Sequence, residues 1–227
     1  ADPVAPTTPV QTTCASDQQC VTGRLEDGLV AGLAYTCSTI SSTTTAAGEF
    51  TCPVGSTVQF SIRHIDSPHV VTFGQAVVPS PLQNESFLPV DGNGNPVNRV
   101  YLTPLSLVGA LSLSEPAAAG ARNIARLLHA LNYRTDNVGL DDNPARDIIL
   151  TSSVKKDFLD AMGISANLGS MSEAAFEMDV GGALARMATP RSLISVADAN
   201  GVLEKSVYSV VAGVYADNGF MNSTLAG

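Results

Sequence analysis

Two cysteines lie at the ends of short segments in which side chains alternate in character, and this pattern constrains the fold more than any other feature. Residues 33–37 alternate large apolar side chains with small or polar ones and end at Cys37. Residues 58–62 follow the same rule a few positions after Cys52. A period of two is typical of β-strands with one buried face. Glycine-containing turns separate the segments, at Gly23, Gly28, Gly48 and Gly55. The stretch 21–62 therefore predicts a small β-sandwich fastened by a disulfide.

All four cysteines fall in the first quarter of the chain, and they indicate an oxidising compartment. Four cysteines allow three connectivities. We expect Cys14–Cys20 and Cys37–Cys52, because each pair closes a short loop between segments that would lie side by side. A zinc site needs close Cys-x-x-Cys or His–Cys spacing, which this set lacks. The cysteines therefore predict two structural disulfides in a protein of the periplasm, the cell surface or the medium.

The overall composition fits an extracellular β-rich protein and argues against some partners. Charged residues make up 15% of the 227 residues, aromatic residues make up 5%, and the net charge is −9. The acidic balance is diffuse and contains no basic run, so neither nucleic acid nor an anionic membrane is an expected partner. No apolar run is long enough to span a bilayer. We expect a protein exported through a cleaved signal.

The chain divides into three parts by composition. Residues 1–13 are rich in proline and threonine, which predicts an extended linker or a strand donated to another molecule. Residues 14–110 hold the alternating segments and would form the β-sandwich module. Residues 111–227 would form a mainly helical region, with helices over 115–133, 152–163 and 170–190. The β-branched and aromatic residues of 207–215 predict a final strand. The expected fold class is α+β: a disulfide-braced N-terminal β-sandwich, a helical region and a returning C-terminal strand.

Local signals mark the ends of the later helices. Gly163 follows the last periodic residue of the second helix and would stop it. Ser170 and Glu173 have the spacing of a capping box at the start of the third helix. Two glycines, Gly181 and Gly182, weaken that helix at its middle, which indicates close packing or a break.

Two patterns of catalytic residue types are present, and neither completes an active site. Ser152 and Ser153 each precede a lysine by three positions, a spacing used by penicillin-recognising enzymes, but the accompanying Ser-Asp-Asn and Lys-Thr-Gly motifs are missing. We expect a serine here to cap a helix. His64, Asp66 and Ser67 are the residue types of a triad, yet neighbours this close in an extended chain face different sides. We therefore do not expect an enzyme.

Two loops rich in aspartate and asparagine are candidates for a structural calcium ion. The first loop, residues 91–98, lacks the closing glutamate of an EF-hand. The second loop holds more carboxylates than a plain turn requires, at Asp136, Asp141, Asp142 and Asp147. Calcium favours flexible cages of oxygen ligands, so this second loop is the candidate metal site. Turn chemistry with a helix cap is the alternative. No other cofactor is expected.

The opening of the chain resembles the transthyretin-like and CnaB-like β-sandwich modules of secreted bacterial surface proteins. The matching positions are Val21, Gly23, Asp27, Val30, Gly32, Gly48, Phe50, Val58, Phe60 and Ile62. The segment 101–137 resembles one that follows such modules in proteobacterial lipoproteins and adhesin-like proteins, and Tyr133 with Arg134 departs from its usual Asp/Gly/Asn loop. The resemblance implies a structural sandwich and supplies no catalytic residues.

These observations together favour a non-enzymatic bacterial surface protein, either a filament (pilus-like) subunit or an adhesin module. The Pro/Thr-rich start and the late strand would each be able to complete a neighbour's sheet, so copies of this chain or other surface subunits are the expected partners. A secreted serine-type hydrolase is the alternative from another class. A periplasmic ligand-binding lipoprotein is a third hypothesis, and it requires a pocket between the two halves.

Overall fold

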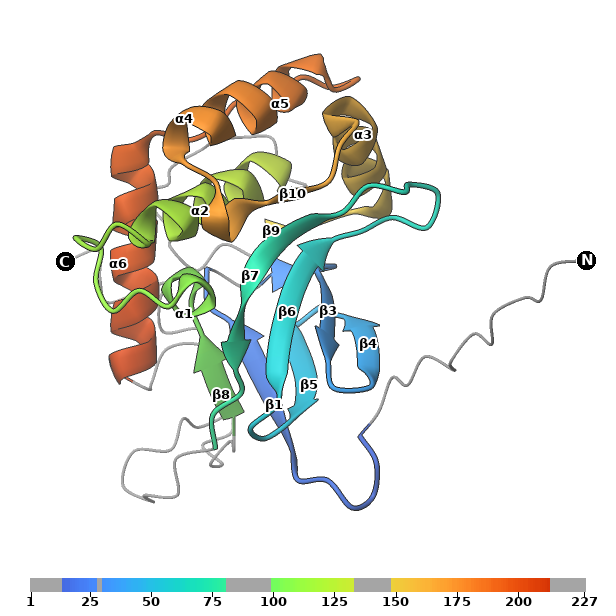
Figure 1. The fold of residues 1–227 in the computed structure, drawn as a ribbon, viewed down its shortest axis with the longest axis vertical. Helices are drawn as coiled ribbons and strands as arrows, with labels where there is room; N and C mark the ends of the chain where they lie inside the picture. The colour runs from blue at the N-terminus through green and yellow to red at the C-terminus, as the bar shows by residue number, and fades with distance from the viewer. Residues whose placement is uncertain (1–13, 28–29, 81–98, 133–147, 213–227) are drawn as a thin grey trace, which may run out of the picture.

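Two packed β-sheets with helices against them form the part of the chain that the structure describes, residues 14–27, 30–80, 99–132 and 148–212. In this computed structural model most strands precede most helices along the chain (Figure 1). The larger sheet has five strands in the order β10-β7-β6-β3-β4. These strands are β3 (Ala34–Cys37), β4 (Ile40–Thr43), β6 (Thr57–Ile62), β7 (Val71–Val77) and β10 (Ala166–Asn167).

The smaller sheet has three strands in the order β5-β1-β8 and packs against the larger one. Its strands are β1 (Cys20–Leu25), β5 (Glu49–Pro53) and β8 (Arg99–Leu102). The ring of Phe50 in the smaller sheet lies 5.9 Å from that of Tyr35 and 5.3 Å from that of Phe60, both in the larger sheet. Aromatic pairs at such distances add attraction to the burial of their area. The predicted sandwich of alternating strands is therefore confirmed.

Both predicted disulfides are present. Cys37–Cys52 joins the two sheets, since Cys37 ends β3 and Cys52 belongs to β5, and both residues are buried. Cys14–Cys20 closes the short loop that leads into β1. These two bonds place the protein in an oxidising environment, because structural disulfides rarely persist in reducing compartments.

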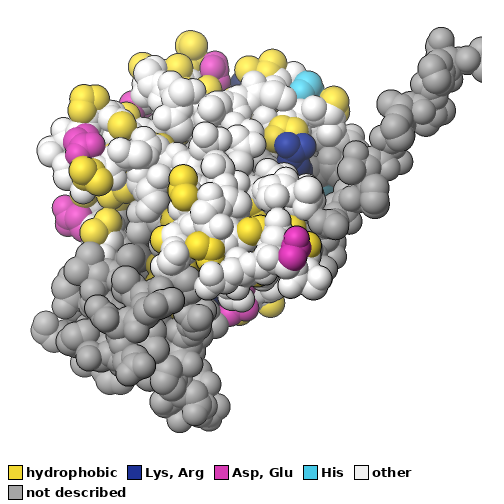
Figure 2. Space-filling model, turned by 60° about the horizontal axis from the view of Figure 1, so that its bottom comes forward, with side chains coloured by type: hydrophobic (Ala, Val, Ile, Leu, Met, Phe, Trp, Pro, Cys, Tyr) yellow, Lys and Arg dark blue, Asp and Glu magenta, His cyan; other side chains and the backbone are white. Residues whose placement is uncertain are grey.

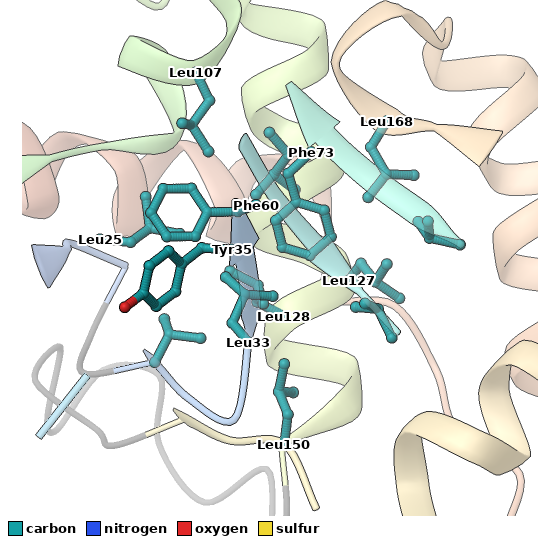
Figure 3. Close-up of a cluster of buried hydrophobic side chains, with 14 of the residues drawn as sticks. Leu25, Leu33, Tyr35, Phe60, Phe73, Leu107, Leu127, Leu128, Leu150 and Leu168 are labelled. Carbon is teal, nitrogen blue, oxygen red and sulfur yellow. The ribbon is translucent and has the colours of Figure 1, made fainter. Parts of the chain in front are cut away.

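The first two predicted helices are also confirmed, as α2 (Ala118–Leu131) and α3 (Ser152–Met162), and a short helix α1 (Pro104–Val108) precedes them. The apolar stripe of α2 is fully buried and consists of Ile124, Leu127, Leu128 and Leu131. Figure 3 shows Leu127 and Leu128 in one cluster with Phe60 and Phe73 of the larger sheet. Helix α3 ends as expected at Gly163, which adopts a left-handed φ of 63°.

The third predicted helix is divided and begins later than its expected cap. It consists of α4 (Glu173–Phe176), a π-helical turn (Glu177–Gly181) and α5 (Gly182–Arg186). The capping residue is Ser172, whose hydroxyl accepts from the backbone of Ala175, and the expected cap Ser170 lies in a preceding 3₁₀ turn. The expected break occurs at the paired glycines, where the π-turn gives way to α5.

Residues after 110 pair with strands from the first half of the chain and pack into the same hydrophobic core. Strand β10 pairs in parallel with β7, and β9 (Ile148–Ile149) pairs in parallel with β2 (Val30–Ala31). One buried cluster contains Phe60 of the larger sheet together with Phe158 of α3 and Phe176 of α4. The limits 14–110 and 111–227 for two separate modules therefore stay a prediction.

The predicted final strand over 207–215 is wrong in its described part, because residues up to 212 belong to helix α6 (Val196–Ala212). Ala199 and Leu203, four positions apart, are fully buried against a row of small residues on α2, Ala118, Ala121 and Ala125. Burial at helical spacing against α2 outweighs the strand preference of the β-branched residues, which is strongly dependent on context. Of the described strands after residue 110, β10 joins the larger sheet and β9 pairs with β2 in a separate two-stranded sheet.

Candidate functional site

Strand β4 leaves the outer edge of the larger sheet open (Figure 1). A two-residue turn joins it to β3, and Cys37 faces Ile40 in the closing pair. Hydrogen-bonded and non-bonded pairs alternate along an antiparallel ladder, so the backbone groups of Ser41 and Thr43 point away from β3. Within the described chain nothing hydrogen-bonds to these outward groups. Unpaired edge groups of this kind are a template for another strand.

At the β5 edge of the smaller sheet, one backbone group has a hydrogen-bond partner. The backbone N–H of Thr51 in β5 donates to the hydroxyl of Tyr35 at 3.2 Å. This bond takes up a donor that would otherwise face outward. The contrast makes β4 the better candidate for an interaction with another chain.

A groove of about 420 Å³ opens beside β4. One wall consists of Ser41, Ser42 and Thr43, and the opposite side combines the segment 63–70 with Lys155 from α3. Segments far apart in sequence therefore meet at this edge: the β3–β4 hairpin, the β6–β7 connection and the first turns of α3 (Figure 1). None of the described lining residues is acidic.

Two cationic side chains, Lys155 and Arg63, line this groove, although the whole chain has a net charge of −9. The Lys155 ammonium donates to the carbonyl of Gly32 at 2.7 Å, and its partial burial lowers the pKa of this lysine. Arg63 is exposed, and its Nε donates to the hydroxyl of Ser61 at 3.2 Å. Both side chains retain further N–H donors, since an ammonium has three and a guanidinium has five.

His64 meets a serine in the structure, but not the one next to it in sequence. Its Nε2 lies 3.0 Å from the hydroxyl of Ser152, the first residue of α3. Its Nδ1 accepts from the backbone N–H of Asp66 at 3.1 Å. A neutral imidazole that accepts at Nδ1 carries its proton on Nε2, so His64 donates to Ser152. A general base would have to accept there, so the tautomer that fits both contacts does not serve Ser152 as a base. That His64, Asp66 and Ser67 form no triad stays a prediction.

The Ser-x-x-Lys pattern also has a structural explanation. The residue that caps α3 is Thr151, whose hydroxyl accepts from the backbone of Val154 at 3.3 Å, so the expectation of a serine cap is wrong by one or two positions. The amine of Lys155 is directed to the Gly32 carbonyl. Lys156 pairs with Asp160, and this hydrogen bond raises the pKa of the lysine. Neither lysine hydrogen-bonds to the serine that precedes it by three positions.

The candidate calcium ligands Asp136, Asp141, Asp142 and Asp147 lie outside the described residues, and so does the loop 91–98. Over the ranges that the structure describes, no group of three or more His, Cys, Asp or Glu side chains is placed to hold a metal ion. The calcium site stays a prediction.

A buried pair that sequence reasoning missed lies between the smaller sheet and α2. The carboxylate of Asp27 is fully buried, and neither of its oxygens has a hydrogen-bond partner among the described residues. Nε2 of His129 lies 3.8 Å from one of these oxygens. The Glu-Asp-Gly sequence around Asp27 has the composition of an exposed turn, so no local signal indicates this burial.

The fold and site thus define an α+β protein built on a disulfide-linked sandwich with an open sheet edge at β4 in its described part. No family model, curated protein or solved structure matches the chain. The resemblance to transthyretin-like and CnaB-like modules remains a prediction.

No helix in the described ranges is long and apolar enough to cross a bilayer. The face shown in Figure 2 carries scattered carboxylates and only one small patch of Lys or Arg among its coloured residues.

Proposed function

We propose that this protein is a structural component of a bacterial cell surface that joins its neighbours by β-strand addition at β4. It would serve as a filament (pilus-like) subunit or as a module of an adhesin. The observation that carries the proposal is the unpaired outward backbone of Ser41 and Thr43 in a disulfide-braced sandwich. Main-chain hydrogen bonds at such an edge are a recurrent source of affinity between protein chains.

The sequence of β4 supports this proposal because it lacks two common devices that protect an edge, proline and charge. Its four residues, Ile40–Thr43, include no proline and no charge. Natural sheets commonly block exposed edges with lysine, proline or a bulge. The Cys37–Cys52 bond anchors the hairpin next to the edge, which reduces the ordering cost when a strand is added.

Two donors are compatible with this edge: the Pro/Thr-rich start of a neighbouring copy, or an extended segment of another surface subunit. Residues 10–13, Val-Gln-Thr-Thr, form a run of four without proline or charge, which equals the length of β4. A strand of this length would form main-chain bonds with both Ser41 and Thr43.

The test compares two substitutions at one position. Ser41→Pro removes the outward N–H, whereas Ser41→Ala keeps it and changes only the side chain. Light scattering and electron microscopy of the oxidised protein should show assembly for the wild type and Ser41→Ala, and its loss for Ser41→Pro with an unchanged melting temperature. Deletion of residues 1–13 separates the donors, because assembly is lost only if this segment is the added strand. A wild type that stays monomeric with or without other surface subunits would contradict the proposal.

A serine hydrolase at Ser152 is the second candidate, because the 3.0 Å contact with His64 brings a hydroxyl and an imidazole together beside a groove. The proton on Nε2 of His64 argues against this activity, because that nitrogen would have to accept the proton of the Ser152 hydroxyl. A fluorophosphonate probe that labels the wild type but not Ser152→Ala would establish this activity. Absence of labelling in the oxidised, folded protein would eliminate it.

A further inference from the structure

We infer that the strand that adds to β4 is an acidic extended segment of a partner protein, with carboxylate side chains at alternate positions. This inference rests on the proposed strand addition and names the chemistry of its partner. Four features of the groove carry it: its position along β4, its charge, its free hydrogen-bond donors and its lack of Phe, Tyr and Trp.

Pairing with β4 would place the partner's side chains on the face of the sheet that carries the groove. Residues paired across two strands point to the same face of the sheet. Ser41 and Thr43 both pair through their outward backbone groups, and both line the groove. The two partner residues opposite them are therefore two positions apart, and their side chains project from the groove side of the sheet.

The charge of the groove favours carboxylates at those two positions. Arg63 and Lys155 line it, and none of its described lining residues is acidic. A carboxylate next to this lining is that of Asp66, which is 67% exposed and has an oxygen 3.8 Å from Nδ1 of His64. A locally cationic groove on a chain of net charge −9 selects an anionic partner.

Both cations keep donors for such a partner. Lys155 uses one N–H for the Gly32 carbonyl, which holds the ammonium in place and leaves two. Arg63 uses its Nε for Ser61, and its two Nη groups have no partner in the described chain. A guanidinium with free Nη groups binds a carboxylate through two parallel hydrogen bonds.

A peptide fits these features better than an acidic saccharide. Three residues of β4 line the groove, and the outer edge of this strand offers donors and acceptors with the spacing that another strand matches. Phe, Tyr and Trp are missing from the described residues that line the groove, so it lacks the large aromatic rings on which a sugar ring commonly stacks.

The experiment titrates the whole oxidised protein, labelled with ¹⁵N, with three capped peptides. The first is Thr-Val-Glu-Val-Glu-Val-Thr, the second replaces both Glu by Gln, and the third is the chain's own segment 7–13, Thr-Thr-Pro-Val-Gln-Thr-Thr. We expect the Glu peptide to shift the amide signals of Ser41 and Thr43 and to bind about two- to fivefold more tightly than the Gln peptide, the effect of roughly one exposed ion pair. Arg63→Gln should reduce this preference, and Ser41→Pro should abolish binding of all three.

The outcomes separate the two proposals. Equal binding of the Glu and Gln peptides, with loss of both in Ser41→Pro, would overturn the acidic partner and leave strand addition in place. Tighter binding of the 7–13 peptide than of the Glu peptide would also overturn it, in favour of the chain's own start. If Ser41→Pro leaves the affinity for the peptides unchanged, both this inference and strand addition are contradicted. The same holds if no peptide shifts the amide signals of Ser41 and Thr43.

Discussion

At the scale of single residues, the most unusual feature is the carboxylate of Asp27. Buried carboxylates normally accept several hydrogen bonds or pair closely with a cation. Within the described residues both oxygens of Asp27 lack a hydrogen-bond partner, and His129 is too distant for a hydrogen bond. Burial of a carboxylate in these surroundings is expected to lower the stability of the folded protein.

Replacing this carboxylate should stabilise the protein. We expect Asp27→Asn to raise the free energy of unfolding by about 1–2 kcal/mol at neutral pH, because the cost of burying an unbonded charge disappears. Urea unfolding measures the change. The matched control is Asp17→Asn at an exposed site, which should change stability by less than about 0.5 kcal/mol. A marked loss of stability in Asp27→Asn would show that this carboxylate has a favourable partner.

At the scale of elements, helix α6 depends on burial more than on local preference. Leu203 is fully buried and belongs to the cluster formed with the small residues of α2. The neighbouring Glu204 is exposed. One apolar side chain therefore anchors the middle of this helix.

Shortening that side chain tests whether α6 is docked as described. Leu203→Ala should lower the free energy of unfolding by about 2–4 kcal/mol, since it removes buried methyl groups and leaves a cavity. Glu204→Ala, one position along, should change it by less than about 0.5 kcal/mol. Equal and small effects of the two substitutions in denaturant unfolding would contradict the packing of α6 on α2.

Elements differ in how much of them is predictable from sequence. Strands β3 and β6 were predictable because their alternation, such as Val58, Phe60 and Ile62, coincides with a buried face. Helix α6 was not, because its β-branched residues suit a strand until their partners on α2 are known. The groove was beyond prediction as well, since it joins Thr43, Arg63 and Lys155 from three distant segments.

At the scale of the whole molecule, the two disulfides contribute unequally. Cys37–Cys52 spans a separation of 15 residues and joins two sheets, whereas Cys14–Cys20 spans 6 residues within one loop. A cross-link restricts the unfolded chain more when it closes a longer loop. The inter-sheet bond also holds the β3–β4 hairpin, on which the proposed interaction depends.

Removing each bond in turn tests this ranking. The double variant Cys37→Ala/Cys52→Ala should lose about 3 kcal/mol of stability, and Cys14→Ala/Cys20→Ala about 2 kcal/mol. Thermal and urea unfolding provide the values. Light scattering of the first variant should also show weaker assembly than the second, because its edge strand is less firmly held. A larger loss of either property in the Cys14/Cys20 variant would contradict the role assigned to the inter-sheet bond.

Amide hydrogen exchange on β4 decides whether this edge is where the protein meets its neighbours. The N–H groups of Ser41 and Thr43 have no partner in the described chain, so they should exchange rapidly in the dispersed protein. Strand addition would slow their exchange at least about tenfold in the assembled protein. Exchange at these two amides that is equally fast in both states, while other amides become protected, would place the contact elsewhere and contradict strand addition at β4.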